Sequence, residues 1–141
     1  MRLSICAVMV FMVMIASEAS ETKTEVKHSP ARMTSPASGK EMFLNYCASC
    51  HGKGAKGNGP AAAAFNTPPA DLTGLAKRNH GKYPAERVAA VLRGEATLVS
   101  HGTQDMPVWG RVFWRMSPGD TGQVDLRIAN LNRYLESLQV K

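Results

Sequence analysis

Cysteine is scarce in this chain of 141 residues, with three in all, of which Cys6 lies in an apolar N-terminal run. The other two, Cys47 and Cys50, allow no disulfide framework beyond a single bond between them. Long apolar runs are also missing, because the run from Ile5 to Ala16 is too short to cross a bilayer as a helix. No stretch alternates apolar and polar residues as a strand would, and no internal repeat is visible. The sequence therefore excludes a disulfide scaffold and predicts no stable membrane span.

A block of basic residues is missing too, although the formal net charge is +6. The Lys and Arg residues are scattered along the chain, and neither a recognition helix nor an aromatic RNA-binding motif accompanies them. We therefore expect no nucleic-acid partner. A solvated basic surface that attracts acidic partners accounts for the charge.

The N-terminus has the pattern of a secretory signal peptide over residues 1–19. Arg2 precedes the apolar run, and Ser17 and Ala19 provide the small residues of a cleavage site. We expect export, with an uncleaved membrane anchor as the alternative. Residues 20–37 are poor in large apolar side chains and are predicted to form a flexible segment, which leaves residues 38–141 as the folded domain.

Apolar spacing predicts an all-α fold with three main helices and short helical turns. The first helix starts at Ser38, where Glu41 completes a capping box, and runs into Cys47. The second spans residues 84–93 and ends at a glycine. The third begins near Asp120, and its apolar residues recur at spacings of four and three: Val124, Ile128, Leu131, Leu135 and Leu138. Between these helices we predict a glycine-rich loop over residues 52–60 and an ordered loop over residues 100–116.

Chemistry is concentrated at Cys47-Ala48-Ser49-Cys50-His51. Thiols at positions i and i+3 of a helical turn can each form a thioether to one edge of a porphyrin, and the next residue then lies under the iron. The pattern therefore indicates a covalent haem attachment site. Structural zinc is an alternative, but it needs four ligands and would have to recruit distant histidines. A thioredoxin-like dithiol is another, but it needs a βαβ framework that this chain lacks.

A bound haem requires partners beyond these five residues. The second ring nitrogen of His51 needs a hydrogen-bond acceptor, and a backbone carbonyl near Pro60 in the following loop is the natural candidate. Four residues can provide a ligand on the opposite face of the iron: Met106, Met116, His80 and His101. Context favours Met106, because a rigid proline follows it and Trp109 is placed to wall the haem. His101 remains the competitor.

With these residues the chain resembles class I c-type cytochromes, specifically the small monohaem bacterial kind. The resemblance covers about residues 38–139 and rests on four motifs: the pentad at 47–51, Gly59-Pro60, Met106-Pro107 and Leu131-Asn132-Arg133-Tyr134-Leu135. It implies a small cytochrome c fold wrapped around one covalently attached haem c. It also implies that Cys47 and Cys50 are the thioether anchors, that His51 and Met106 are the axial ligands, and that the Pro60 carbonyl accepts from His51.

The same resemblance implies that the first and last helices cross at Gly39 and Phe43 on one side and Tyr134 on the other. The resemblance does not identify the partners of the haem propionates, for which our own candidates are Trp109, Arg78, Asn79 and Arg111.

The function that follows is that of an exported, periplasmic one-electron carrier between redox partner proteins, whose iron cycles between Fe(II) and Fe(III). We expect a monomer or a subunit of a respiratory complex, and no enzyme activity. Lys53 and Lys56 are placed to steer acidic partners. Two alternatives stay open: a haem subunit of a larger membrane oxidoreductase, and a haem enzyme or gas-binding protein with a displaceable sixth ligand.

Overall fold

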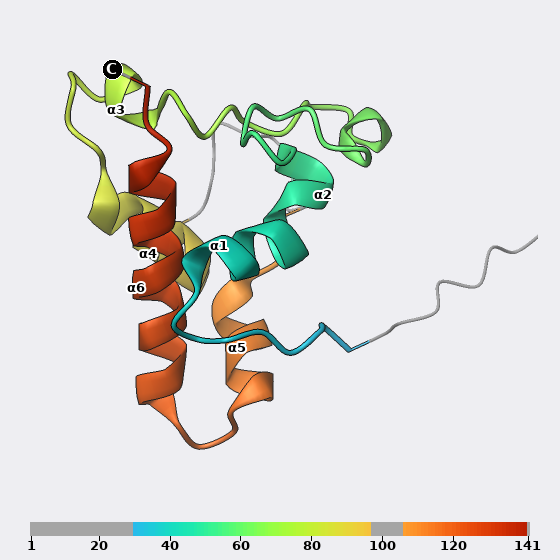
Figure 1. Ribbon diagram of the computed structural model, residues 1–141, viewed down its shortest axis with the longest axis vertical. Coiled ribbons are helices and arrows are strands. Elements are labelled where there is room, and N and C mark those ends of the chain that lie inside the picture. Colours follow the sequence, from blue (N-terminus) through green and yellow to red (C-terminus); the bar gives the residue numbers. More distant parts are fainter. Residues whose placement is uncertain (1–29, 97–105, 141) are drawn as a thin grey trace, which may run out of the picture.

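The structure, a computed structural model, describes residues 30–96 and 106–140. Within these residues every regular element is helical, and Figure 1 shows their arrangement. The elements are α1 (Gly39–Met42), a π-helical turn (Phe43–Cys47), α2 (Ala48–His51), a 3₁₀ turn (Ala62–Ala64), α3 (Leu75–Arg78), α4 (Ala85–Arg93), α5 (Trp109–Met116) and α6 (Thr121–Ser137). The predicted all-α class is confirmed. None of the helices in these two ranges is long and apolar enough to cross a bilayer. The predicted signal peptide lies outside the described residues.

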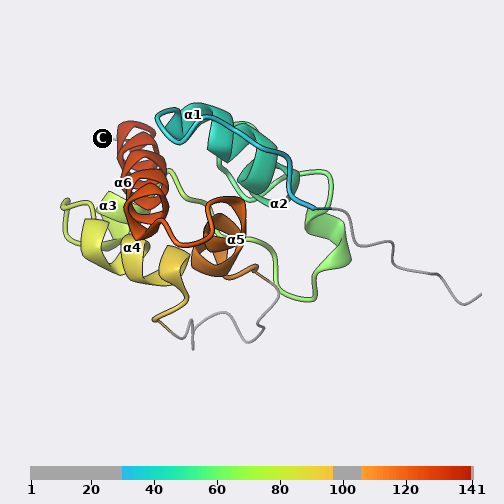
Figure 2. The same cartoon turned by 90° about the horizontal axis from the view of Figure 1, so that it is seen from below.

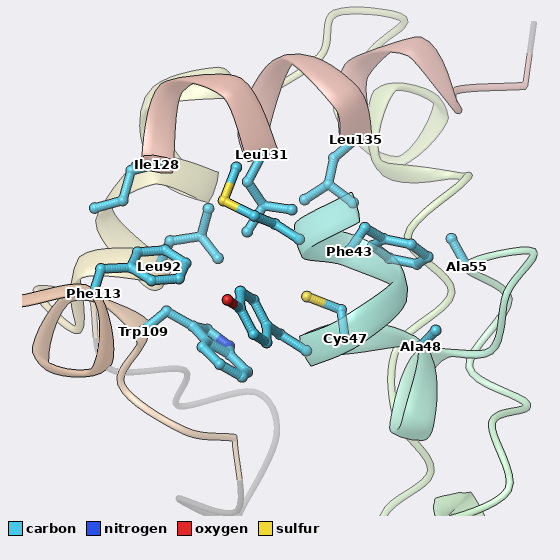
Figure 3. Packing of buried hydrophobic residues seen from close by; sticks show 12 residues of the cluster. Phe43, Cys47, Ala48, Ala55, Leu92, Trp109, Phe113, Ile128, Leu131 and Leu135 are labelled. Carbon is cyan, nitrogen blue, oxygen red and sulfur yellow. The ribbon is translucent and has the colours of Figure 1, made fainter. Parts of the chain in front are cut away.

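The long C-terminal helix α6 is the centre of the fold, and α1, α4 and α5 each pack against it. Seen end-on, α6 has α1 on one side and α4 on the other (Figure 2). The helix begins where predicted, because the Asp120 side chain accepts a hydrogen bond from the Gln123 N–H at 3.0 Å. Its apolar face, with Ile128, Leu131 and Leu135, points into the core that these helices share (Figure 3).

Helix α1, the π turn and α2 form one uninterrupted helical segment that ends at His51. Ser38 caps it as predicted, since its hydroxyl accepts from the Glu41 N–H at 3.2 Å. The other half of the predicted capping box differs, because the Glu41 carboxylate accepts from the N–H of Ser35. The wider π turn lies directly before the two cysteines, and π turns of this kind often mark functional sites.

The predicted crossing of the first and last helices is present in the structure. A Cβ placed on Gly39 would lie 2.1 Å from the Asn130 carbonyl oxygen and 2.7 Å from the Tyr134 Cβ. The rings of Phe43 and Tyr134 pack beside this point, with centroids 5.5 Å apart. Only glycine allows the two backbones to approach this closely.

Residues 30–37 contribute to the folded domain, contrary to the prediction from the sequence. Thr34 is buried, and its hydroxyl lies 2.7 Å from the Tyr46 hydroxyl and 3.1 Å from an Arg127 nitrogen. The boundary predicted between a flexible segment and the domain is therefore too late. The reason is that the hydroxyl and carbonyl oxygens of Thr34 bind polar groups of distant residues inside the core. The number of apolar residues in the segment, on which the prediction was based, does not indicate such contacts.

The prediction of an ordered loop over residues 100–116 is wrong for its second half. Residues from Trp109 onward form α5, whose inner face carries the buried Trp109 and Phe113. Gly110 suggested a break, but it lies in the first turn, where a Cβ would come 2.9 Å from the Arg93 carbonyl oxygen of α4. This glycine allows two helices to approach closely and does not interrupt α5.

Candidate functional site

A cavity of about 600 Å³ lies beside the cysteine pair. It is bounded by residues 46–51, by the irregular stretch 65–79, by α4 and by residues 106–109. Its wall is mostly apolar and includes Phe65, Pro68, Leu72, Leu75, Val88, Val91, Leu92 and Leu135. The volume lies within the range of about 300–1,000 Å³ that is typical of ligand and cofactor sites.

Both cysteines of the motif line this cavity as free thiols. Cys47 is buried and projects toward the interior (Figure 3), whereas Cys50 is partly exposed. Burial, reinforced by the neighbouring Cys50, raises the pKa of the Cys47 thiol to about 12. At neutral pH this side chain is therefore an uncharged sulfhydryl, which suits the apolar wall of a macrocycle site better than a thiolate does.

His51 lines the same cavity, and a specific contact orients its ring. Nδ1 lies 2.9 Å from the carbonyl oxygen of Ala70. Because a carbonyl can only accept, Nδ1 carries a proton, and in the neutral imidazole the lone pair that a metal needs then lies on Nε2. The Ala70 contact therefore suits the tautomer that a metal ligand uses.

The predicted acceptor, the Pro60 carbonyl, is wrong: Ala70 provides the oxygen at Nδ1. After His51 the loop folds back onto the end of α2. The Gly57 N–H donates to the His51 carbonyl at 2.8 Å, and the Gly59 N–H donates to the Cys50 carbonyl at 3.0 Å. This path leaves Pro60 in a separate shallow hollow, beside Lys53 and outside the cavity. Which carbonyl reaches the ring depends on the return path of the chain, and the sequence motif does not show that path.

A short turn fixes the Ala70 carbonyl. The Asp71 carboxylate accepts from the Thr73 N–H at 2.8 Å and from the Thr73 hydroxyl at 2.7 Å, and the Leu72 N–H donates to the Ala55 carbonyl at 2.7 Å. The Thr73 hydroxyl, followed by the Thr73 N–H, holds the pKa of Asp71 below its usual value. The turn lies in the irregular stretch 65–79 and holds the acceptor that the imidazole uses.

Met106, the residue predicted as the far-side ligand, and Trp109, the residue predicted to wall the haem, both line the cavity. Trp109 is buried and stacks on Tyr46, with centroids 5.3 Å apart. Of the rival ligands, His80 is exposed and absent from the cavity wall, and Met116 lies 3.8 Å from the Tyr46 hydroxyl in the core. His101 lies outside the described residues.

The polar part of the cavity wall includes three residues that suit carboxylates. Two of the propionate candidates, Arg78 and Asn79, line it, whereas Arg111 of α5 does not. Arg87 lines the cavity and was missed. The signal was present in the helix spacing: Pro84, Arg87, Val88 and Val91 lie at i, i+3, i+4 and i+7, the stripe that a helix presents to one side.

These features fit a haem, which is a flat apolar macrocycle with two carboxylates. Two thiols stand at one edge, an imidazole is oriented by its second nitrogen, a thioether lines the wall, and two guanidinium groups are available to the carboxylates. The zinc alternative finds no support, since no three His, Cys, Asp or Glu side chains gather to hold a metal in the part of the chain that is described. The dithiol alternative lacks its framework, because residues 30–96 and 106–140 contain no strand.

A helical domain with this pentad and cavity defines a c-type cytochrome. Residues 34–116 match the family model described as cytochrome C oxidase, cbb3-type, subunit III, and the chain belongs to this family of c-type cytochromes. Membership implies haem c as the cofactor and electron transfer as the role. Comparisons with curated proteins and with solved structures gave no match.

Proposed function

We propose that this protein is an exported one-haem cytochrome that carries single electrons between redox partner proteins and performs no reaction on a substrate. One observation carries the proposal: Cys47, Cys50, His51 and Met106 line the same cavity although Met106 lies far along the chain from the other three. A thiol pair and an imidazole alone would anchor a haem whose iron keeps its sixth coordination position open. A methionine in the same wall provides a sixth ligand and leaves no site for a substrate.

The haem, when bound, supplies a centre that gains and loses one electron without making or breaking covalent bonds. Cys47 and Cys50 anchor it, and the Ala70 carbonyl orients His51 toward it. Trp109 and Tyr46, which are buried and stacked on each other, form part of the wall that Met106 also lines. Arg78, Asn79 and Arg87 are the candidates for the propionates. A thioether ligand favours the reduced state and raises the potential.

Docking of partners is expected to depend on charge. Lys53 and Lys56, which the sequence put forward for steering acidic partners, are both exposed. Arg87 is exposed as well and lines the cavity. Association with an acidic partner should therefore slow as ionic strength rises.

The deciding experiment is an absorption spectrum of the purified protein, oxidised and reduced, with carbon monoxide added to the reduced form. The proposal expects a covalently bound haem, a far-red sulfur-to-iron charge-transfer band in the ferric protein, and no rapid change with carbon monoxide. A missing band together with ready carbon monoxide binding would favour the enzyme or gas-binding alternative.

A second candidate, a haem subunit of a larger membrane oxidoreductase, is favoured by the description of the matched family. Gel filtration of a gently solubilised native extract separates the two. Elution at the mass of one small domain supports the carrier, and co-elution with a membrane complex supports the subunit. Recovery of a haem protein that begins near residue 20 in the periplasmic fraction would support the proposed export and location.

A further inference from the structure

The core contains a buried cation that the haem site does not use. Arg127 of α6 is only 2% exposed. Its guanidinium donates to the Thr34 hydroxyl at 3.1 Å and to the Thr34 carbonyl at 3.0 Å, lies 3.8 Å from the Met42 sulfur, and stands 5.8 Å from the centre of the Phe113 ring. Its Nε has no hydrogen-bond partner among the described residues.

The partners of Arg127 are all uncharged. In residues 30–96 and 106–140 the ion pair present joins Arg93 to Asp125 at the surface, and no carboxylate reaches Arg127. Arginine is rarely buried without an anion, because removing its charge from water costs free energy that neutral oxygens and an aromatic face only partly recover. The positive charge therefore remains uncancelled in a medium of low polarity.

A directed chain of hydrogen bonds connects this charge to the cavity wall. Arg127 donates to the Thr34 hydroxyl at 3.1 Å. The Tyr46 hydroxyl donates its single proton to the Arg32 carbonyl at 2.6 Å, so in the 2.7 Å contact between the two hydroxyls Thr34 is the donor. Tyr46 lines the cavity. Phe113, under the guanidinium, has its centroid 6.0 Å from the Tyr46 centroid. Arg127 thus lies directly behind the aromatic wall on the Tyr46 side.

We propose that Arg127 is a positioning residue that sets the reduction potential of the haem by holding an unpaired positive charge behind Tyr46, which lines the cavity. The proposal rests on the proposed haem-binding function. Loss of one electron adds one positive charge to the site, and a fixed cation in a medium of low polarity opposes that change. Arg127 therefore favours the reduced form. The same guanidinium fixes Thr34, which accounts for the contribution of residues 30–37 to the folded domain.

The test separates charge from structure with four substitutions in the holoprotein. Arg127→Met removes the charge and the hydrogen bonds, and Arg127→Gln removes the charge but keeps an N–H donor for Thr34. Arg127→Lys keeps the charge in a different geometry. Thr34→Val keeps the arginine and removes its hydroxyl partner. Arg133→Met, an exposed position on the same helix, is the control for loss of a solvent-screened charge.

The measurement is the equilibrium constant for electron exchange with a redox mediator of known potential, at low and high salt, together with urea unfolding. Arg127→Met and Arg127→Gln should shift that constant about tenfold toward the oxidised protein, with little dependence on salt. Arg127→Lys and Thr34→Val should unfold more easily yet exchange electrons with nearly the parent constant. Arg133→Met should change it less than about twofold.

Two outcomes overturn the inference. If Arg127→Gln and Arg127→Lys give the same constant, the effect is structural and the charge is irrelevant. If both neutral variants keep the parent constant, Arg127 serves only stability. Should Arg127→Met fail to fold, the Gln and Lys pair still decides. Absence of a bound haem in the parent protein would instead refute the proposed function, so the two failures are distinguishable.

Discussion

The imidazole Nδ1 of His51 lies 2.9 Å from the carbonyl oxygen of Ala70, across a loop that carries the chain away from the attachment motif and back. This contact fixes both the tautomer and the plane of the ring. Its acceptor belongs to the backbone and depends on the turn that Asp71 and Thr73 close. The chemistry of the attachment motif thus depends on a segment with no recognisable signature.

The Asp71 turn makes stability depend on pH. Because the Thr73 donors lower the pKa of Asp71 in the folded state, its contribution is present above the unfolded pKa and is lost as pH falls through the folded pKa. Asp71→Asn should therefore lower the free energy of unfolding at pH 7, and this deficit should be smaller at acidic pH, below the ordinary aspartate pKa of about 3.9. Urea unfolding at both pH values checks this. Asp125→Asn, which removes an exposed carboxylate from a surface pair, is the control, and an equal deficit at both pH values would contradict the prediction.

Replacing Met106 tests the proposed sixth ligand. Met106→Ala should abolish the far-red charge-transfer band of the ferric protein and lower its potential, because the iron loses its thioether. Met116→Leu is the matched control: Met116 contacts Tyr46 in the core, so this exchange should keep the band and cost less than about 1.5 kcal/mol of stability. Visible spectra of both ferric variants decide. Loss of the band in His101→Ala, with retention in Met106→Ala, would transfer the assignment to His101.

The close crossing of α1 and α6 at Gly39 implies that a substitution of this glycine strongly lowers the stability of the protein. Gly39→Ala should destabilise the protein by about 1–3 kcal/mol, because its Cβ would meet the Asn130 carbonyl, which cannot move without shifting α6. Gly54→Ala is the control, since a Cβ there meets no atom within 4 Å, and its effect should stay within about 0.5 kcal/mol. Denaturant unfolding compares the two. Equal stability of both variants would mean that the helices separate readily.

The partly buried phenol of Tyr83 should lower the free energy of unfolding at alkaline pH. Burial, followed by the nearby Glu136, raises the pKa of this phenol, whose hydroxyl donates to the Asn132 side chain at 2.7 Å. Its contribution is therefore complete below the unfolded pKa of about 10 and is lost as pH rises through the folded pKa. Tyr83→Phe should cost about 1 kcal/mol at pH 8, and the gap to the parent should narrow by pH 11. Urea titrations at both pH values measure it, and a gap that widens with pH would have the wrong sign.

The sequence by itself determined the features that depend on local spacing. These are the thiol pair one helical turn apart, the capped start at Ser38 and the apolar stripe of α6. The close crossing at Gly39 came from the resemblance to class I c-type cytochromes, and the structure confirmed it. In each of the local cases the partners lie within one or two turns, so periodicity and cap chemistry are enough.

The tertiary structure alone decided the features whose partners are distant. At the His51 ring it placed the Ala70 carbonyl instead of the predicted Pro60 carbonyl, and in the core it joined Thr34 to Arg127. The physical reason is the same in each case. A backbone carbonyl has no side-chain signature, and the burial of a charged or hydroxyl side chain depends on which distant groups satisfy it, so these contacts exist only once the chain has closed on itself.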